Sequence, residues 1–219
     1  MTSGPIAVIG GTGKLGSALA RRLAKAGHTV IIGSRSAQSA SQAAAQLGLG
    51  VTGLSNGDAA ASAGNFVIVT VPFAAQESTL AEIKAGVTGK IVVDTTVPLI
   101  PPKVMRVQLP PEGSAAQRAQ NFLGTSASVV SAFHNVAADK LATDQEIDCD
   151  VLVFGDDKHA RAKVVALTKL IGLRGLHGGP LANSAAAEAL TSVLIFINKT
   201  YQVAGAGLRI TGQLIEPDG

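Results

Sequence analysis

The sequence has little cysteine, few aromatic residues and no long apolar segment. Its single cysteine, Cys149, excludes an internal disulfide and a cysteine-cluster metal site, which is typical of the reducing cytoplasm. Aromatic residues are 3% of the chain and the formal net charge is +3, without a basic block, so no nucleic acid is expected as a partner. The densest apolar run, residues 193–197, is too short to span a bilayer, and no signal-peptide pattern follows Met1, so we expect no membrane attachment.

The first thirty residues carry a glycine-rich turn between an expected strand and an expected helix. A β-branched run over Ile6–Ile9 predicts a buried strand, and apolar residues at helical spacing from Lys14 predict a helix. Between them, Gly11, Gly13 and Gly16 form the pattern G-x-G-x-x-G, which allows a tight turn, close approach of a pyrophosphate and close helix packing. Because a helix N-terminus presents free N–H groups to phosphates, this stretch predicts a dinucleotide site; a purely structural turn is the alternative.

The end of the next expected strand, residues 29–32, indicates which dinucleotide binds. An NAD site places a carboxylate there to accept hydrogen bonds from the ribose, but this chain reads Gly33-Ser34-Arg35-Ser36. Arg35 offers a planar, permanently charged donor fork and the serines offer hydroxyls, which suits a 2′-phosphate. We therefore predict an NADP site at Ser34 and Arg35, with a solvated surface arginine as the alternative.

Strand and helix patterns alternate along most of the remaining chain. Helical segments separate expected strands at residues 51–54, 66–71, 90–94, 129–133, 151–154 and 174–177. This alternation predicts a Rossmann-like, doubly wound parallel α/β sheet. A length of 219 residues with 47% hydrophobic content suits one full α/β domain and a small addition. We expect an NADP-binding domain over residues 1–180 and a small C-terminal helical portion over residues 181–219 that completes the substrate cleft.

Two segments depart from this alternation. Residues 95–113 hold five of the nine prolines in one long connection. Because this connection leaves the carboxyl end of a strand, where open α/β sheets bind ligands, we expect a lid or pocket wall, with a mobile surface loop as the alternative. A late helix over residues 185–203 is apolar around so much of its circumference that it must be buried, in this subunit or against another.

The sequence shows no metal-ligand spacing and no evident acid–base set. Its four histidines are scattered and its one tyrosine, Tyr201, lies in the late apolar helix, whereas a carbonyl or imine reductase needs a positioned proton donor. Hydride transfer directly between two cofactor rings needs chiefly alignment, because the second ring delocalises the charge. We expect no metal site and no catalytic side chain. His134, at the end of a strand, is a candidate orienting residue, with a hydrogen-bonded core histidine as the alternative.

The chain resembles the coenzyme F420-dependent NADP reductases, which move hydride between NADP and a deazaflavin. The similarity runs along nearly the whole chain, through GGTGKLG, GSR, TVPF, SAFHNVAA, VFGDD and GPLANS, the last of which precedes the long apolar helix. It implies a cytoplasmic oxidoreductase that transfers hydride reversibly between NADP(H) and F420. It also implies that NADP and F420 are the small-molecule partners and that the late helix contributes to a homodimer contact.

The resemblance also assigns cofactor contacts. The glycine turn would hold the pyrophosphate, the serine–arginine pair the 2′-phosphate, and the TVPF segment the nicotinamide, while residues 134–136 and the turn at 179–181 would border the deazaflavin. The implied cofactor-binding residues are Gly11, Thr12, Gly13, Lys14, Leu15, Gly16, Ser34, Arg35, Val71, Pro72, Phe73, His134, Asn135, Val136, Pro180 and Leu181.

Two other functions stay open from the residues alone. One is an NADPH-dependent reductase of another acceptor, such as a flavin, a ferric chelate or an imine. The other is a non-catalytic NADP-binding sensor. The physiological direction of hydride transfer does not follow from the sequence, since transfer between two cofactors of similar potential is reversible.

Overall fold

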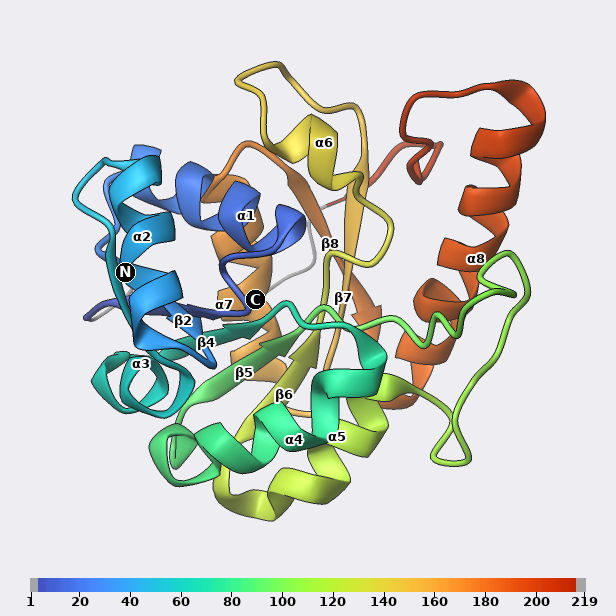
Figure 1. Ribbon diagram of the computed structural model, residues 1–219. Coiled ribbons are helices and arrows are strands. Elements are labelled where there is room, and N and C mark those ends of the chain that lie inside the picture. Colours follow the sequence, from blue (N-terminus) through green and yellow to red (C-terminus); the bar gives the residue numbers. More distant parts are fainter. Residues whose placement is uncertain (1–3, 216–219) are drawn as a thin grey trace.

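The computed structural model describes residues 4–215, which form one eight-stranded sheet flanked by helices on both faces (Figure 1). The strands are β1 (Ile6–Ile9), β2 (Val30–Ser34), β3 (Thr52–Ser55), β4 (Phe66–Val69), β5 (Ile91–Asp94), β6 (Ser128–Ser131), β7 (Asp150–Phe154) and β8 (Arg174–Gly179). The helices are α1 (Lys14–Lys25), α2 (Ala37–Leu47), α3 (Asn56–Ser62), α4 (Phe73–Ile83), α5 (Ala115–Leu123), α6 (Ala138–Leu141), α7 (Lys158–Leu170) and α8 (Ser184–Tyr201).

The strand order is β3-β2-β1-β4-β5-β6-β7-β8, and the first six of these strands are mutually parallel. This arrangement confirms the Rossmann-like α/β fold class. The alternation of elements did not predict that β7 pairs antiparallel with β6, with Ser131 opposite Phe154, or that β8 follows the direction of β7. A parallel neighbour needs a crossover element that packs across the sheet. The connection from β6 to β7 contains only the four-residue α6, which lies against α1 instead.

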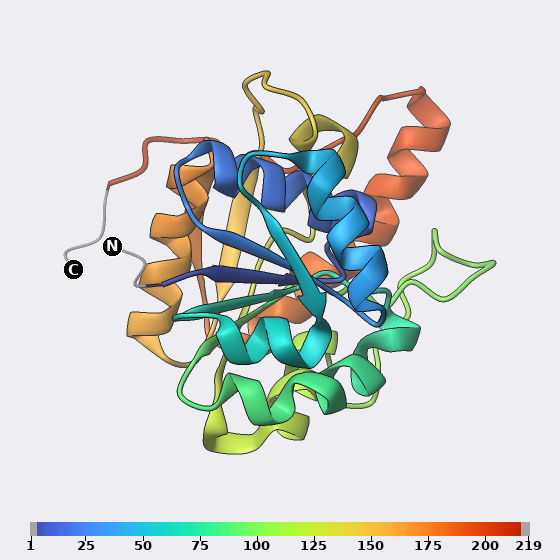
Figure 2. The ribbon, with the colours of Figure 1, turned by 60° about the vertical axis from the view of Figure 1, so that its left-hand side comes forward.

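Two apolar cores lie on opposite faces of the sheet. Successive strand residues point to opposite faces, so Ile6 and Val8 join one core while Ala7 and Ile9 join the other. Helices α1, α2 and α7 cover the first core, and α3, α4 and α5 cover the second (Figure 2). Burial on both faces explains the continuous apolar strands seen in the sequence.

Helix α8 stands beside the sheet and is only partly buried within this chain (Figure 1). On its first half, Ser184, Glu188 and Ser192 are at most 2% exposed. Its second half exposes Phe196 at 54% and Tyr201 at 73%. Of the two expected alternatives, burial within the subunit therefore applies to residues of the first half, and burial against another molecule stays a prediction for the exposed second half.

The segment Leu181–Tyr201 is, within residues 4–215, the one helix that has the length and apolar composition needed to cross a membrane. The short run at residues 193–197 did not predict this. The first half of α8 is fixed to the folded domain by hydrogen bonds of buried groups, including Glu188, and extraction of a buried carboxyl group into lipid is unfavourable. The exposed apolar face therefore suits contact with a protein better than a bilayer.

The proline-rich connection runs alongside α8 (Figure 1). The hydroxyl of Ser192 donates to the carbonyl of Arg106 over 3.2 Å. Within the loop, Nε2 of Gln108 donates to the carbonyls of Ile100 and Lys103. A hydrogen bond thus joins α8 to the loop that leaves the carboxyl end of β5.

Candidate active site

The glycine-rich turn lies at the carboxyl end of β1, an inner strand of the sheet between β2 and β4. The N–H groups of Gly10 and Gly11 donate to the carbonyl of Gly33, and that of Gly13 donates to the carbonyl of Gly10. Gly13 is the N-cap of α1, with no side-chain cap and no acidic residue in the first helical turn. Among the described residues, no backbone carbonyl accepts from the N–H groups of Thr12 and Lys14, so these two groups are available to an anion, and the helix dipole favours one.

The other two glycines of the motif are required by packing. A Cβ on Gly11 would lie 2.7 Å from Cγ2 of Ile32, and a Cβ on Gly16 would lie 2.5 Å from Oγ1 of Thr70. A Cβ on Gly13 would meet only the carbonyl oxygen of Gly10, at 3.3 Å. Gly11 and Gly16 thus bring α1 close to the strands, while Gly13 leaves an open approach for a bulky anion such as a pyrophosphate.

Ser34 and Arg35 lie beside this turn, because Gly33 accepts the hydrogen bonds of the glycine motif. Ser34 ends β2 and is half-buried. Arg35 is exposed and has no hydrogen-bond or ion-pair partner among residues 4–215. Ser36 caps α2 by accepting a hydrogen bond from the N–H of Ser39. The guanidinium of Arg35 and the hydroxyl of Ser34 are donors of a kind that a phosphate group can accept from.

Residues 71–73 follow β4, the neighbour of β1, and begin helix α4. Cγ1 of Val71 lies 2.9 Å from the position that a Cβ on Gly10 would take, so the two segments touch. Pro72 is exposed as the N-cap of α4. The guanidinium of Arg118 lies 4.0 Å from the ring centroid of Phe73 and donates to the Phe73 carbonyl over 3.0 Å. This stacking and hydrogen bond fix the start of α4 against α5.

A buried polar network that we did not predict from the sequence supports this wall. Nε2 of Gln76 donates to Oδ2 of Asp94 and to the carbonyl of Ala115, and its Oε1 accepts from Nε of Arg118. Burial raises the pKa of Asp94, whose side chain is fully enclosed at the end of β5. The sequence signal was an acidic residue directly after a buried apolar strand.

His134 lies beyond the end of β6, in a buried and strained segment. Its Nε2 is 3.1 Å from Oγ of Ser131, while its Nδ1 is buried without a partner among the described residues. Burial lowers the pKa of His134 to about 3, so the imidazole is neutral at physiological pH. The preceding residue, Phe133, has a φ of +68°, a conformation that non-glycine residues rarely adopt outside constrained sites.

The two residues after His134 are held by the first half of α8. Nδ2 of Asn135 donates to the carbonyl of Ala187 over 2.9 Å and to Oγ1 of Thr191 over 3.2 Å. The hydroxyl of Thr191 in turn donates to the carbonyl of His134 over 3.0 Å. Val136 is buried in the core. The position of residues 134–136 therefore depends on α8.

The turn after β8 lies at the same level of the sheet as the end of β6. Gly179 pairs with Phe154, which in turn faces Ser131, so two strand spacings, about 10 Å, separate Gly179 from Ser131. Pro180 is exposed, whereas the side chain of Leu181 is completely buried. Leu181 can therefore present only its backbone to a ligand.

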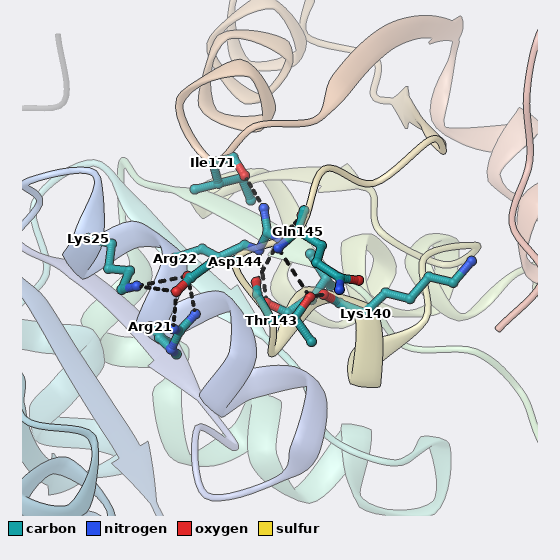
Figure 3. A network of polar contacts seen from close by, with 9 residues as sticks. Arg21, Arg22, Lys25, Lys140, Thr143, Asp144, Gln145 and Ile171 are labelled. Carbon is teal, nitrogen blue, oxygen red and sulfur yellow. Dashed lines mark hydrogen bonds and ion pairs between the residues drawn. The ribbon is translucent and has the colours of Figure 1, made fainter. Parts of the chain in front are cut away.

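Helix α1 is also tied to the loop that follows α6 (Figure 3). The guanidinium of Arg22 donates to the carbonyls of Leu141, Thr143, Gln145 and Ile171 at 2.8–3.0 Å. Asp144 pairs with Arg21 and Lys25, and hydrogen bonds from these two cations hold the pKa of Asp144 well below its usual range. At the other end of α1, Lys14 lies 3.5 Å from Asp139 on α6. The segment after His134 is thus anchored to the helix that begins at the glycine turn.

Together these groups form a row along one sheet edge. The strand order places Ser34, the glycine turn, Pro72 and His134 at the ends of β2, β1, β4 and β6. Three strand spacings, about 14 Å, separate the ends of β1 and β6. This row has anion-binding groups at one end and a neutral, enclosed segment at the other. Such an edge defines the chain as a dinucleotide-binding protein of the Rossmann class.

Comparisons with known proteins give the family. Residues 5–98 match the family model described as NADP oxidoreductase, coenzyme F420-dependent. The chain is 43% identical to an F420-dependent NADP reductase of Methanothermobacter thermautotrophicus over 94% of both chains. It is 42% identical to that of Methanocaldococcus jannaschii, over 94% of this chain and 97% of the relative. The chain belongs to the family of F420-dependent NADP reductases.

Solved structures agree with this assignment. A putative F420-dependent NADP reductase from Arthrobacter sp. FB24 has a TM-score of 0.83 at 28% identity, covering 94% of this chain and 99% of that one. An imine reductase from Myxococcus stipitatus has a TM-score of 0.65 at 20% identity, and this chain spans 62% of its length. The second likeness concerns the fold alone.

Proposed function

We propose that the protein transfers a hydride reversibly between NADP(H) and the deazaflavin F420, so that NADPH, F420 and a proton are converted to NADP⁺ and reduced F420. The observation that carries this proposal is the single sheet edge that places an unpaired Arg35 near the glycine turn and a neutral His134 segment three strands away. Family membership supports the same pair of substrates.

The NADP half of the site consists of groups that bind and orient. The N–H groups of Thr12 and Lys14 donate to the pyrophosphate, Gly13 leaves room for its approach, and Leu15 is half-buried behind them. Ser34 and Arg35 donate to the 2′-phosphate, which distinguishes NADP from NAD. Burial on both sides of the strands holds these groups in place before the ligand arrives, which reduces the entropy lost on binding.

The second half of the site excludes water and aligns the acceptor. Val71, Pro72 and Phe73 form one wall and residues 134–136 the other, with Pro180 and the backbone of Leu181 at the rim. The nicotinamide supplies or accepts the hydride when it is bound. His134 is the candidate orienting residue, and it does not act as an imidazolium acid, because its pKa is far below 7. Alignment, with no catalytic acid, is sufficient for transfer between two rings.

A direct assay tests this function. Purified protein mixed with NADPH and F420 should bleach the deazaflavin absorbance band, and reduced F420 with NADP⁺ should restore it. Ferric chelates and flavins serve as alternative acceptors in parallel reactions. The proposal is wrong if NADPH binds but F420 is neither bound nor reduced. Turnover of another acceptor alone would assign the protein to the second class of reductase, and tight NADP binding without any turnover would assign it to the sensors.

We infer that the protein is a cytoplasmic homodimer. The apolar face on the second half of α8 supports the dimer, because Val193 and Phe196 are 43% and 54% exposed on one helix. The single reduced and buried Cys149 is consistent with a reducing compartment. We also propose the domain division expected from the sequence: residues 1–180 carry the NADP half of the site and residues 181–219 complete the cleft, with residues 1–3 and 216–219 outside the described part of the chain. Light scattering of wild type and Phe196→Glu tests the dimer, since a charge on this face should yield monomers.

A further inference from the structure

Glu188 is the one acidic residue on α8 and is only 1% exposed. Its carboxyl group sits on the N-terminus of α5, where Oε2 accepts from the N–H of Ala115 over 2.6 Å and Oε1 from the N–H of Ala116 over 3.1 Å. One turn earlier on the same face of α8, the hydroxyl of Ser184 donates over 2.8 Å to the hydroxyl of Ser114, the N-cap of α5. This face of α8 is thus hydrogen-bonded to the start of α5.

The neighbouring face of the same two turns carries Ala187 and Thr191, which bind Asn135 and the backbone of His134. A third position, Ser192, binds the proline-rich loop. The first half of α8 therefore joins the rigid end of α5 to the segments that border the second substrate. Glu188 makes two bonds to backbone N–H groups of α5, at 2.6 and 3.1 Å.

We propose that Glu188 is a positioning residue for the deazaflavin half of the site: by anchoring α8 to α5 it holds residues 134–136 in the conformation that binds F420. Glu188 has no contact with the phosphate-binding part of the NADP half, which rests on α1 and β2. A loosened α8 lowers the fraction of protein that is competent to bind F420, and the apparent dissociation constant rises by the same factor. This proposal rests on the function proposed above.

The charged surroundings of Glu188 give it a pH dependence. Burial, together with the nearby carboxyl group of Asp94, raises the pKa of Glu188 to about 8. The other titratable or charged groups on the elements around this part of α8 are Arg118 on α5, His134 in the held segment and Arg106 in the loop. Because the pKa is raised only when α8 is docked, protonated Glu188 favours docking, and docking weakens as pH rises from about 4.5 to about 8.

The experiment compares Glu188→Ala, Glu188→Gln and the matched surface variant Glu146→Gln. Dissociation constants for F420, from its fluorescence, and for NADPH are measured on each protein. We expect Glu188→Ala to weaken F420 binding about tenfold or more, equivalent to ~1.4 kcal/mol, with NADPH binding within about twofold of wild type. Glu188→Gln keeps one acceptor oxygen and carries no charge, but its amide nitrogen cannot accept from the second N–H group, so it should bind F420 with an affinity between those of Glu188→Ala and wild type at pH 6. Glu146→Gln should bind like wild type.

Hydrogen exchange in the ligand-free protein provides a readout that does not depend on F420. The amides at the start of α5 and in residues 134–136 should lose protection from exchange in Glu188→Ala. In wild type, the protection of these amides, corrected for intrinsic exchange, should fall as the pH rises from 5 to 8. In Glu188→Gln, which has no carboxyl group at this position, the protection should not change with pH in this way. Equal loss of NADPH and F420 affinity, or unchanged protection in residues 134–136, would overturn the proposal. If Glu188→Ala does not fold, Ser184→Ala removes another bond of the same anchor and is judged by the same criteria. Failure of the wild-type protein to bind F420 would refute the proposed function. Unchanged hydrogen exchange in Glu188→Ala would refute the positioning role of Glu188.

Discussion

Replacement of Arg35 by alanine tests the NADP half of the site most directly. The side chain is exposed and unpaired among the described residues, so its removal should leave the thermal stability of the protein unchanged. A hydrogen bond to a charged group contributes about 1.5–3 kcal/mol, and solvent exposure reduces this toward the lower value. Loss of ~1.4 kcal/mol weakens NADPH binding about tenfold. NADH lacks the 2′-phosphate, and its binding should not change.

The assay measures dissociation constants for NADPH and NADH in wild type, Arg35→Ala, Arg35→Lys and the surface control Arg209→Ala. Arg35→Lys retains the charge but not the planar fork, so it should lie between wild type and alanine. The NADPH preference of wild type should also decrease with added salt, because exposed charges are screened. An unchanged ratio of NADPH to NADH affinity in Arg35→Ala would refute the placement of the 2′-phosphate beside Arg35.

Three further predictions concern stability and the glycine turn. Gly13→Ala should fold normally but bind NADPH weakly. Gly16→Ala should bind NADPH weakly and also have a lower melting temperature, because its Cβ would lie 2.5 Å from Oγ1 of Thr70. Equal melting temperatures of the two variants would contradict this difference. Arg22→Ala leaves four carbonyls without their donor and should reduce the free energy of unfolding, measured in urea, by about 2–3 kcal/mol. A loss as small as that of a surface ion pair would contradict a stabilising role for these four hydrogen bonds. Burial lowers the pKa of His134 from 6.5 to about 3, so between these pH values the unfolded state binds more protons and the free energy of unfolding should fall as the pH decreases. His134→Gln should reduce the dependence of this free energy on pH. An unchanged pH dependence in urea titrations would contradict a buried neutral imidazole.

The NADP half of the site could be predicted from the sequence because its determinants are local. Gly11, Gly13 and Gly16 lie within six residues, and the chemistry of Arg35 does not depend on a distant partner. The strands were also predictable, since burial on both faces requires continuous apolar runs such as Ile6–Ile9. Parallel strands then bring their carboxyl ends to one edge, so the rough location of His134 followed from the strand that precedes it.

Other features depended on contacts between residues far apart in the chain. The reversal of β7 depends on how the connection after β6 packs against α1, and the pattern of apolar residues is the same for either strand direction. The network of Gln76, Asp94 and Arg118 joins three elements and leaves no local pattern. Glu188 interrupts an apolar helix, but the sequence alone does not show which backbone groups it meets.

The sequence by itself thus determined the fold class, the glycine turn and the choice of NADP, because each depends on neighbouring residues and on the alternation of elements. Only the tertiary structure decided that α8 is half anchored and half exposed. The reason is physical: an apolar helix has the same sequence pattern whether it is covered by its own chain or by another molecule. The buried bonds of Ser184, Glu188 and Ser192 distinguish the anchored half from the exposed one.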